Sequence, residues 1–580
     1  MSESSKVPVK ISLLLIISAA FVLRFVGIWY GLPSLYNSDE PLHVINALTY
    51  GATKSLKPVY FDYPTLYSYF LFVIYGLYFL VGKIFGVFNT ALDFGASYFL
   101  NPTGLFLVGR FVSVILGITG IWMVYKIGQR FFSKKIGLLS ALILALSFNH
   151  VNTSHWILIE AAVVFMSALA LYLILLFHEN PTIKMNVLAS FVAGLAISTK
   201  YNAGFIFVPL LLTSLLNYKR NVGNLFKNLG ISIATLFIGF LLGTPYWLFS
   251  FSSFLQYFKW DFTQVGYGVV GHIRSVPLFW PLWKLILNDW TVGFLIVAGF
   301  IYVFFQREKK QILFLSFALP TILFVGTWNR ADIHYVLPIY PSLVVLAAIF
   351  FNDILEYIQN FTVRVSLAVL LLFVPLIKII YYDIRLIQKD TRALAEEWIE
   401  SKIPEDSVLG YENFVYGPNL FDPSRFLKNP SESQILPLEL KERLLQERRM
   451  RVSYNLVNFR KDFRPQRFTN NKKGYYSNPY FRKLLELRLP KLATLQKAGV
   501  EYLIISSDNY DRYFRSVPPK KGTPVWFSYQ NGRNFYQSIF DSKAVILLNE
   551  FQPTYWNLGP TIKIYQFKSK LDDNRNGEKR

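Results

Sequence analysis

The sequence predicts a polytopic α-helical membrane protein with a soluble α/β domain after its last span. Of its 580 residues, 53% are hydrophobic, and the mean hydropathy is +0.34. Many apolar runs approach the roughly 20 residues that cross about 30 Å of hydrocarbon. From about residue 388 the composition becomes polar and charged. A soluble chain of this length would instead bury its apolar residues in short stretches.

Eleven apolar runs are predicted to cross the membrane. The first has charged flanks but no small-residue cleavage site, so it is interpreted as a retained span. The spans are 11–30, 105–126, 136–154, 157–177, 185–199, 203–217, 228–247, 290–306, 311–328, 334–351 and 363–382.

One further run, 65–86, is long enough to cross but is rich in Tyr and Phe, as interfacial or re-entrant helices often are. Charge separates the two interpretations. If 65–86 does not cross, every basic short loop lies on one side, as the positive-inside rule requires. These loops carry Lys6, Lys10, Lys126, Arg130, Lys134, Lys135, Lys184, Lys219, Arg220, Lys227, Arg307, Lys309, Lys310 and Arg364. We therefore expect a cytoplasmic N-terminus and an extracytoplasmic tail.

Composition also excludes several classes of function. The net charge of +23 lies in the short loops and the C-terminal third, a distribution that orients a membrane protein, so nucleic-acid binding is not predicted. The chain has no cysteine, which excludes disulfides and thiolate metal sites. It has no Walker loop, dinucleotide fingerprint, HExxH or GxSxG motif.

The predicted topology gathers polar residues on the outer face. YNSDEPLH, in the first external loop (31–104), holds Asp39, Glu40 and His43. A solvated turn closed by Pro41 is one interpretation. Partial desolvation at the lipid boundary favours another, in which Asp39 is a general base. Glu40 would then raise the pKa of Asp39 or share a divalent cation with it, with His43 as a further ligand.

Two more acids lie near this face. Asp62 and Tyr63 precede a proline in VYFDYPTLY, where an aromatic interfacial belt and a binding role are both open. Glu160 lies at the outer end of a span, where a carboxylate near lipid marks a functional site by default.

Cations are predicted on the same side. Arg110 lies inside the outer end of a span, where snorkelling to headgroups is the alternative. Lys200, Arg330 and His334 lie in STKYN and TWNRADIHYVLP. Several cations around an external cavity predict an anionic ligand, and a phosphate at headgroup level fits.

In chain order these motifs resemble the GT-C superfamily of integral-membrane glycosyltransferases, especially family 39, which includes protein O-mannosyltransferases and lipid A aminoarabinose transferases. SDE resembles the family's Asp-Glu motif in the first external loop, and GRFVSVILG its Arg-led second span. HWILIEAAVVF resembles its second acidic site, STKY its Lys-Tyr element, and RADIHYVLPIYP its basic-Tyr-Leu-Pro element. FDYPTLY departs from the family's Pro-Pro segment, and His334 stands where Arg is common.

The resemblance implies a polyprenyl-phosphate-linked sugar donor and inverting transfer to a hydroxyl or amine of a lipid, glycan or protein. It implies that Asp39 accepts the acceptor proton or holds a metal, and that Glu40 orients the acceptor. Arg330, Lys200 and His334 would hold the lipid phosphate. Asp62, Tyr63, Arg110 and Glu160 are further active-site candidates.

Two domains follow from these patterns. Residues 1–387 form the transmembrane GT-C-like domain, with a fourth external loop at 248–289, and residues 388–580 form the extracytoplasmic α/β domain. In the tail, DTRALAEEWIESKIPED predicts a helix, and SVLGY, VEYLIISS, AVILLNEF and TIKIYQF predict strands. KERLLQERRMR (441–451) predicts a charged helix face.

Two other classes of function remain. A transporter or flippase for a lipid-linked glycan would use the same cations, but it would need polar residues through the bilayer, and mid-span charge is scarce. An inactive scaffold whose tail serves assembly is the third hypothesis.

Overall fold

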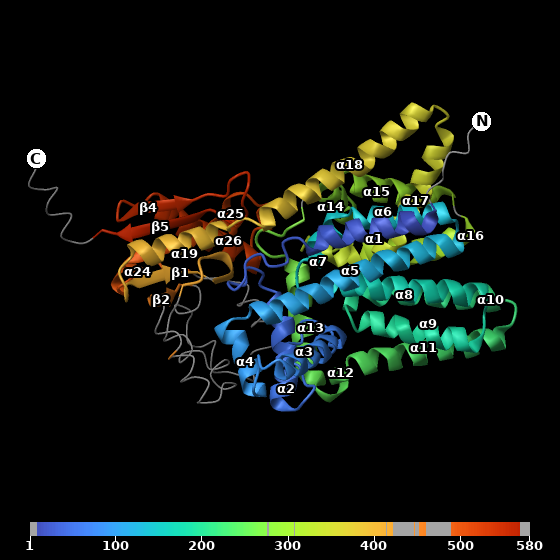
Figure 1. Cartoon of the computed structure of the whole chain (residues 1–580), viewed down its shortest axis with the longest axis horizontal. Coiled ribbons are helices and arrows are strands. Elements are labelled where there is room, and N and C mark those ends of the chain that lie inside the picture. Colours follow the sequence, from blue (N-terminus) through green and yellow to red (C-terminus); the bar gives the residue numbers. More distant parts are fainter. Residues whose placement is uncertain are drawn as a thin grey trace, which may run out of the picture.

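The computed structural model describes residues 8–420 apart from 275, 277, 307 and 413, together with 446, 452–459 and 489–568. A bundle of long helices forms one part of the molecule, and a sheet with its own helices forms the other (Figure 1). Of the predicted charged helix 441–451, every residue except 446 lies outside the described residues.

A helix covers each predicted span. In order these are α1 (Val9–Phe25), α5 (Thr103–Phe131), α6 (Lys134–Ala145) with α7 (Phe148–Ser154), α8 (Ile159–Glu179), α9 (Ile183–Ile197), η1 (Tyr201–Ile206) with α10 (Phe207–Tyr218), α11 (Val222–Gly243), α15 (Thr291–Gln306), α16 (Lys309–Gly326), η2 (Ile333–Ile339) with α17 (Tyr340–Tyr357), and α18 (Phe361–Leu386). Among the described helices, seven are long and apolar enough to cross a membrane, and α6 with α7, bent by 60°, would make an eighth. The seven include the ambiguous run, Leu66–Ile84, by its length and composition. Helices α9, α15 and α16 are shorter apolar helices. The chain is an integral membrane protein.

The ambiguous run is helix α3 (Leu66–Ile84), which packs against the start of α5. Tyr67 shares a hydrogen bond with Ser113 at 3.1 Å, whereas Tyr78, further along α3, lies beside Gly104. Helix α3 therefore runs antiparallel to the first turns of α5, toward the end where α5 begins. Arg110 donates to the carbonyls of Ile28 and Tyr30, just after α1. The chain thus leaves and re-enters the bundle at one end, and α3 does not connect its two ends.

Three shorter helices accompany α3 at this end of the bundle. Helix α2 (Glu40–Thr53) packs on α3, and α4 (Ala91–Leu100) begins with a capping box between Thr90 and Asp93. The fourth external loop contains α12 (Tyr246–Phe249), α13 (Phe251–Tyr267) and α14 (Trp280–Asp289).

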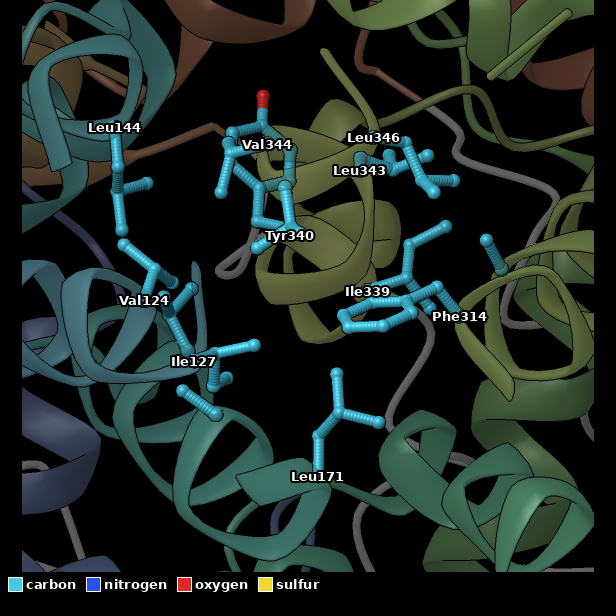
Figure 2. Packing of buried hydrophobic residues seen from close by; sticks show 14 of the residues in the cluster. Val124, Ile127, Leu144, Leu171, Phe314, Ile339, Tyr340, Leu343, Val344 and Leu346 are labelled. Atoms are coloured by element: carbon cyan, nitrogen blue, oxygen red, sulfur yellow. The ribbon is translucent and has the colours of Figure 1, made fainter. Parts of the chain in front are cut away.

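The bundle core centres on α17, whose apolar side chains are almost all buried. Figure 2 shows Tyr340, Leu343, Val344 and Leu346 of α17 in one buried cluster with Val124 and Ile127 of α5 and with Leu144, Leu171 and Phe314 from three other helices. Burial of this kind fixes the bundle that carries the external segments.

The second part is a five-stranded sheet in the order β2-β1-β3-β5-β4. Strands β1 (Val408–Tyr411), β2 (Asn455–Asn458) and β3 (Tyr502–Ser506) are parallel, and β4 (Val545–Phe551) and β5 (Ile562–Phe567) are antiparallel. The accompanying helices are α19 (Thr391–Lys402), α24 (Leu492–Lys497), α25 (Ser507–Phe514) and α26 (Pro524–Phe540). The predicted boundary at 387/388 falls between α18 and α19.

The sheet domain contacts the end of the bundle that carries the two loops predicted to be external, 31–104 and 248–289. The Tyr30 hydroxyl donates to Asp390, and the guanidinium of Arg392 lies 3.7 Å from the centre of the Tyr36 ring. At the same boundary Arg385 donates to the carbonyl of Asn557.

Candidate active site

A cavity of about 670 Å³ lies among the external segments and the ends of several spans. Its polar lining comes from five segments that are far apart in the sequence. The polar residues are Asp39, Asp62, Tyr63, Lys200, Tyr201, Asn202, Asp261, Gln264, Arg330, His334 and Tyr335. Of the predicted site residues, the first-loop acid Asp39 and the basic residues Lys200, Arg330 and His334 therefore face one space.

Asp39 stands at the N-cap position of α2, but its side chain accepts no hydrogen bond from the helix. The hydroxyl of Ser38 donates to it at 3.1 Å. Burial and the nearby charge of Glu160 raise the pKa of Asp39, while Ser38, Arg330 and Lys200 lower it by less. The carboxylate is thus left free for the cavity and is a stronger base than an exposed Asp.

Glu40, the next residue, points elsewhere. Its two oxygens accept hydrogen bonds from Nε and Nη2 of Arg110, both at 2.7 Å, and Oε1 also accepts from the backbone N–H of Ile157 at 2.9 Å. Both charged side chains are fully buried, and neither lines the cavity. Glu40 is therefore held by Arg110 and does not face the cavity, and Arg110 does not snorkel because its donors are used inside the protein.

The predicted metal ligands are not brought together. His43 is buried between Tyr63 and Tyr67, with ring centroids 5.1 and 5.3 Å away, and both Glu40 oxygens are held by Arg110. Within the described part of the chain, no three His, Asp or Glu side chains converge as metal ligands do. The set Asp39, Glu40 and His43 does not fit a divalent ion, and no chemical step is derived through one.

Lys200 is held at the cavity by a buried ion pair. Its Nζ donates to Oε1 of Glu160 at 2.8 Å and to the carbonyl oxygen of His334 at 3.1 Å. It also lies 5.8 Å from the centre of the Tyr335 ring. Glu160 has its second oxygen buried without a hydrogen bond, so its role is to fix Lys200 beside the cavity.

Arg330 is fixed from two directions. Its Nε donates to Oδ2 of Asp332 at 2.7 Å, and its Nη1 donates to the side chain of Gln264 at 3.3 Å. Its side chain keeps 28% exposure, and Nη2 donates to no described residue. Arg330 lines the cavity with this group unbonded to the described residues.

His334 lines the cavity beside Tyr335, with ring centroids 4.3 Å apart. Its backbone carbonyl, not its ring, makes the contact with Lys200. The structure therefore places His334 at the site but gives Lys200 and Arg330 the cationic donors.

A third cavity acid was not expected. Asp261, on α13, joins Asp39 and Asp62 in the lining. Burial and the neighbouring charge of Asp62 raise the pKa of Asp261 to about 8, and burial raises that of Asp62 to about 6. The sequence does carry a signal for the helix that holds Asp261: in FSSFLQYFKWDFTQVGY, apolar residues at 254, 258, 262 and 265 follow helical spacing.

The opposite part of the cavity is apolar and reaches the spans. Phe207 and Leu236 come from helices α10 and α11, and Phe324 comes from α16. Phe207 and Phe324 keep 43% and 39% of their surface exposed. The cavity thus combines charged side chains with apolar side chains from the spans.

A model of a known protein family matches part of the chain. The family model described as dolichyl-phosphate-mannose-protein mannosyltransferase matches residues 103–249. Over that stretch, the match confirms the resemblance to GT-C family 39 glycosyltransferases that the motifs predict. No curated protein matches the chain.

Two solved structures that resemble this chain are distant from it in sequence. The archaeal oligosaccharyltransferase AglB from Archaeoglobus fulgidus, in complex with an inhibitory peptide and a dolichol-phosphate, is 12% identical, with a TM-score of 0.49 over 96% of this chain and 81% of that one. ArnT from Cupriavidus metallidurans, bound to undecaprenyl phosphate, is 13% identical, with a TM-score of 0.46 over 95% of this chain and 97% of that one.

Proposed function

We propose that this protein transfers a sugar from a polyprenyl-phosphate-linked donor to an acceptor hydroxyl or amine, with inversion, on the extracytoplasmic side of the membrane. The observation that carries the proposal is the single cavity that holds a free basic carboxylate, two fixed cations and an apolar end. A lipid-linked sugar phosphate has three parts that match these features. Its polyprenyl chain matches the apolar end, its phosphate matches the cations, and its anomeric carbon is where the acceptor activated by the carboxylate reacts.

The cations bind the donor phosphate. Lys200 and Arg330 face the cavity with N–H donors, and each is held by a buried carboxylate, Glu160 or Asp332. The apolar residues from α10, α11 and α16 border the first isoprene units. Preorganised cations cost little reorganisation when negative charge grows on the leaving phosphate, so they stabilise the transition state.

Asp39 completes the reaction. The acceptor oxygen or nitrogen attacks the anomeric carbon while its proton passes to the Asp39 carboxylate. The bond from that carbon to the phosphate oxygen breaks, and the polyprenyl phosphate leaves with the electron pair. Attack opposite the leaving group inverts the configuration. Asp62 and Asp261, whose raised pKa values favour protonation, are suited to hydrogen-bond sugar hydroxyls in either direction.

The test uses the purified full chain with a panel of synthetic polyprenyl-phosphate sugars, and release of polyprenyl phosphate is measured by mass spectrometry. Glycans and glycosylated lipids or proteins from a deletion strain identify the acceptor. Asp39→Asn should lower turnover by about 10²–10⁴-fold because the general base is lost. It should keep donor affinity.

Asp541→Asn, an exposed acid in the sheet domain, is the matched control and should keep full turnover. The proposal fails if the wild type releases no polyprenyl phosphate from any donor that it binds, or if Asp39→Asn turns over as fast as the control.

A further inference from the structure

Residues 268–274, here called the strap, follow α13 and pair with the segment that carries Arg330. The backbone N–H of Ala331 donates to the carbonyl of His272 at 2.8 Å, and that of Arg274 donates to Asn329 at 2.9 Å. Ile273 and Arg330 form an antiparallel bridge. The backbone on both sides of Arg330 is therefore bonded to the strap.

The other side of the strap is anchored in the sheet domain. Val270 is only 7% exposed and belongs to the buried cluster of that domain, which also contains Tyr510 and Tyr513. Ile273 packs against the same cluster. Gly271, with φ +94°, passes so close to α25 that a Cβ there would lie 3.1 Å from that of Arg512. The strap thus connects the sheet core to the wall of the cavity.

Side-chain contacts also connect the strap to Arg330, in addition to the backbone hydrogen bonds. Nδ1 of His272 lies 2.5 Å from Oδ1 of Asp332, whose other oxygen accepts the hydrogen bond from Nε of Arg330. His272 does not line the cavity, and its side chain is half exposed. Because Asp332 is held at both oxygens, the direction of the Arg330 guanidinium depends on His272.

We propose that Val270 and His272 are positioning residues that let the sheet domain set the direction of Arg330 in the cavity. This proposal rests on the function proposed above, in which Arg330 binds the donor phosphate. The sheet core fixes the strap through Val270, the strap fixes the backbone of Asn329 to Ala331, and His272 fixes Asp332. The sheet domain is then part of the donor site although none of its described residues lines the cavity.

The first arm of the test does not depend on function. Hydrogen–deuterium exchange of the full chain in nanodiscs is compared for Val270→Ala and Val269→Ala. Val269 carries the same side chain one residue earlier but belongs to none of the described buried clusters. We expect faster exchange at the amide of Ala331, which bonds to the strap, in Val270→Ala alone. Equal exchange in both variants would overturn the anchoring step.

The second arm measures binding of undecaprenyl phosphate. His272→Ala should weaken binding about tenfold, and His272→Asn, whose amide can replace the Nδ1 donor, should restore most of it. In the Arg330→Ala background, His272→Ala should have no further effect, because a positioning residue acts only through its partner. Additive losses, or no loss in His272→Ala, would overturn the proposal.

The two proposals can fail separately. If the wild type binds no undecaprenyl phosphate and uses no lipid-linked sugar, the proposed function falls. The exchange arm still decides whether the sheet domain orders the Arg330 segment.

Discussion

Asp39 and Glu40 are neighbours in the chain, but the start of α2 turns their carboxylates to different surroundings. Asp39 faces the cavity and accepts one hydrogen bond, from Ser38. Glu40 neutralises a fully buried arginine. We therefore propose that Asp39 supplies chemistry and that Glu40 holds the first loop rigidly against α5.

This division predicts opposite effects for two isosteric substitutions. Glu40→Gln leaves Arg110 buried without its counter-charge, so it should lower the free energy of unfolding by about 3–5 kcal/mol. Asp39→Asn should leave the melting temperature nearly unchanged while removing turnover. Thermal unfolding of both variants in the same detergent measures this. A catalytic rather than positioning Glu40 would give the reverse, a stable variant without activity.

Asp261 predicts a limit at alkaline pH. Its pKa of about 8 means that it is mostly neutral at pH 7, and it becomes anionic as the pH rises through 8. The new charge acts on Arg330, which is one of the charges that influence Asp261. The KM for the donor should therefore rise above pH 8 in the wild type and stay flat in Asp261→Asn. A rise of equal size in both would remove Asp261 from this role.

At the scale of elements, helices α9 and α11 meet at two glycines beside the cavity. A Cβ on Gly194 would lie 2.1 Å from the carbonyl oxygen of Leu236, and one on Gly239 would lie 2.2 Å from that of Phe191. The nearest atoms belong to the backbone, which cannot move aside as a flexible side chain can, so neither position has room for a methyl group. The same pair of helices supplies Ile197 and Leu236 to the cavity.

Gly194→Ala should therefore force the two helices apart and destabilise the protein by about 1–3 kcal/mol. Gly230→Ala on α11 is the control, because nothing lies within 4 Å of its added Cβ and alanine favours a helix. Its melting temperature should match or exceed that of the wild type. Equal melting temperatures for the two variants would contradict the close packing.

The elements that were predictable are those with a local signal. Apolar runs predicted the helices of the bundle, and VEYLIISS predicted the buried strand β3. Strand β2 and helices α25 and α26 were missed. The pairing of Glu40 with Arg110 and the approach of Asp261 to Asp62 are contacts across 70 and about 200 residues, and only the packed bundle creates them.

At the scale of the whole molecule, the external segments and the sheet domain lie together at one end of the bundle, away from the basic short loops. The central claim is that the cavity opens on that side. Because the chain has no native cysteine, single cysteines report accessibility without interference.

The most direct measurement is labelling of intact cells with a membrane-impermeant thiol reagent. Ser38→Cys and Phe262→Cys sample the cavity, Asp541→Cys samples the sheet domain, and Lys134→Cys samples the turn between α5 and α6. We predict that the first three react in intact cells and that Lys134→Cys reacts only after permeabilisation. Reaction of Ser38→Cys or Phe262→Cys only after permeabilisation, while Asp541→Cys reacts in intact cells, would contradict a shared extracytoplasmic cavity.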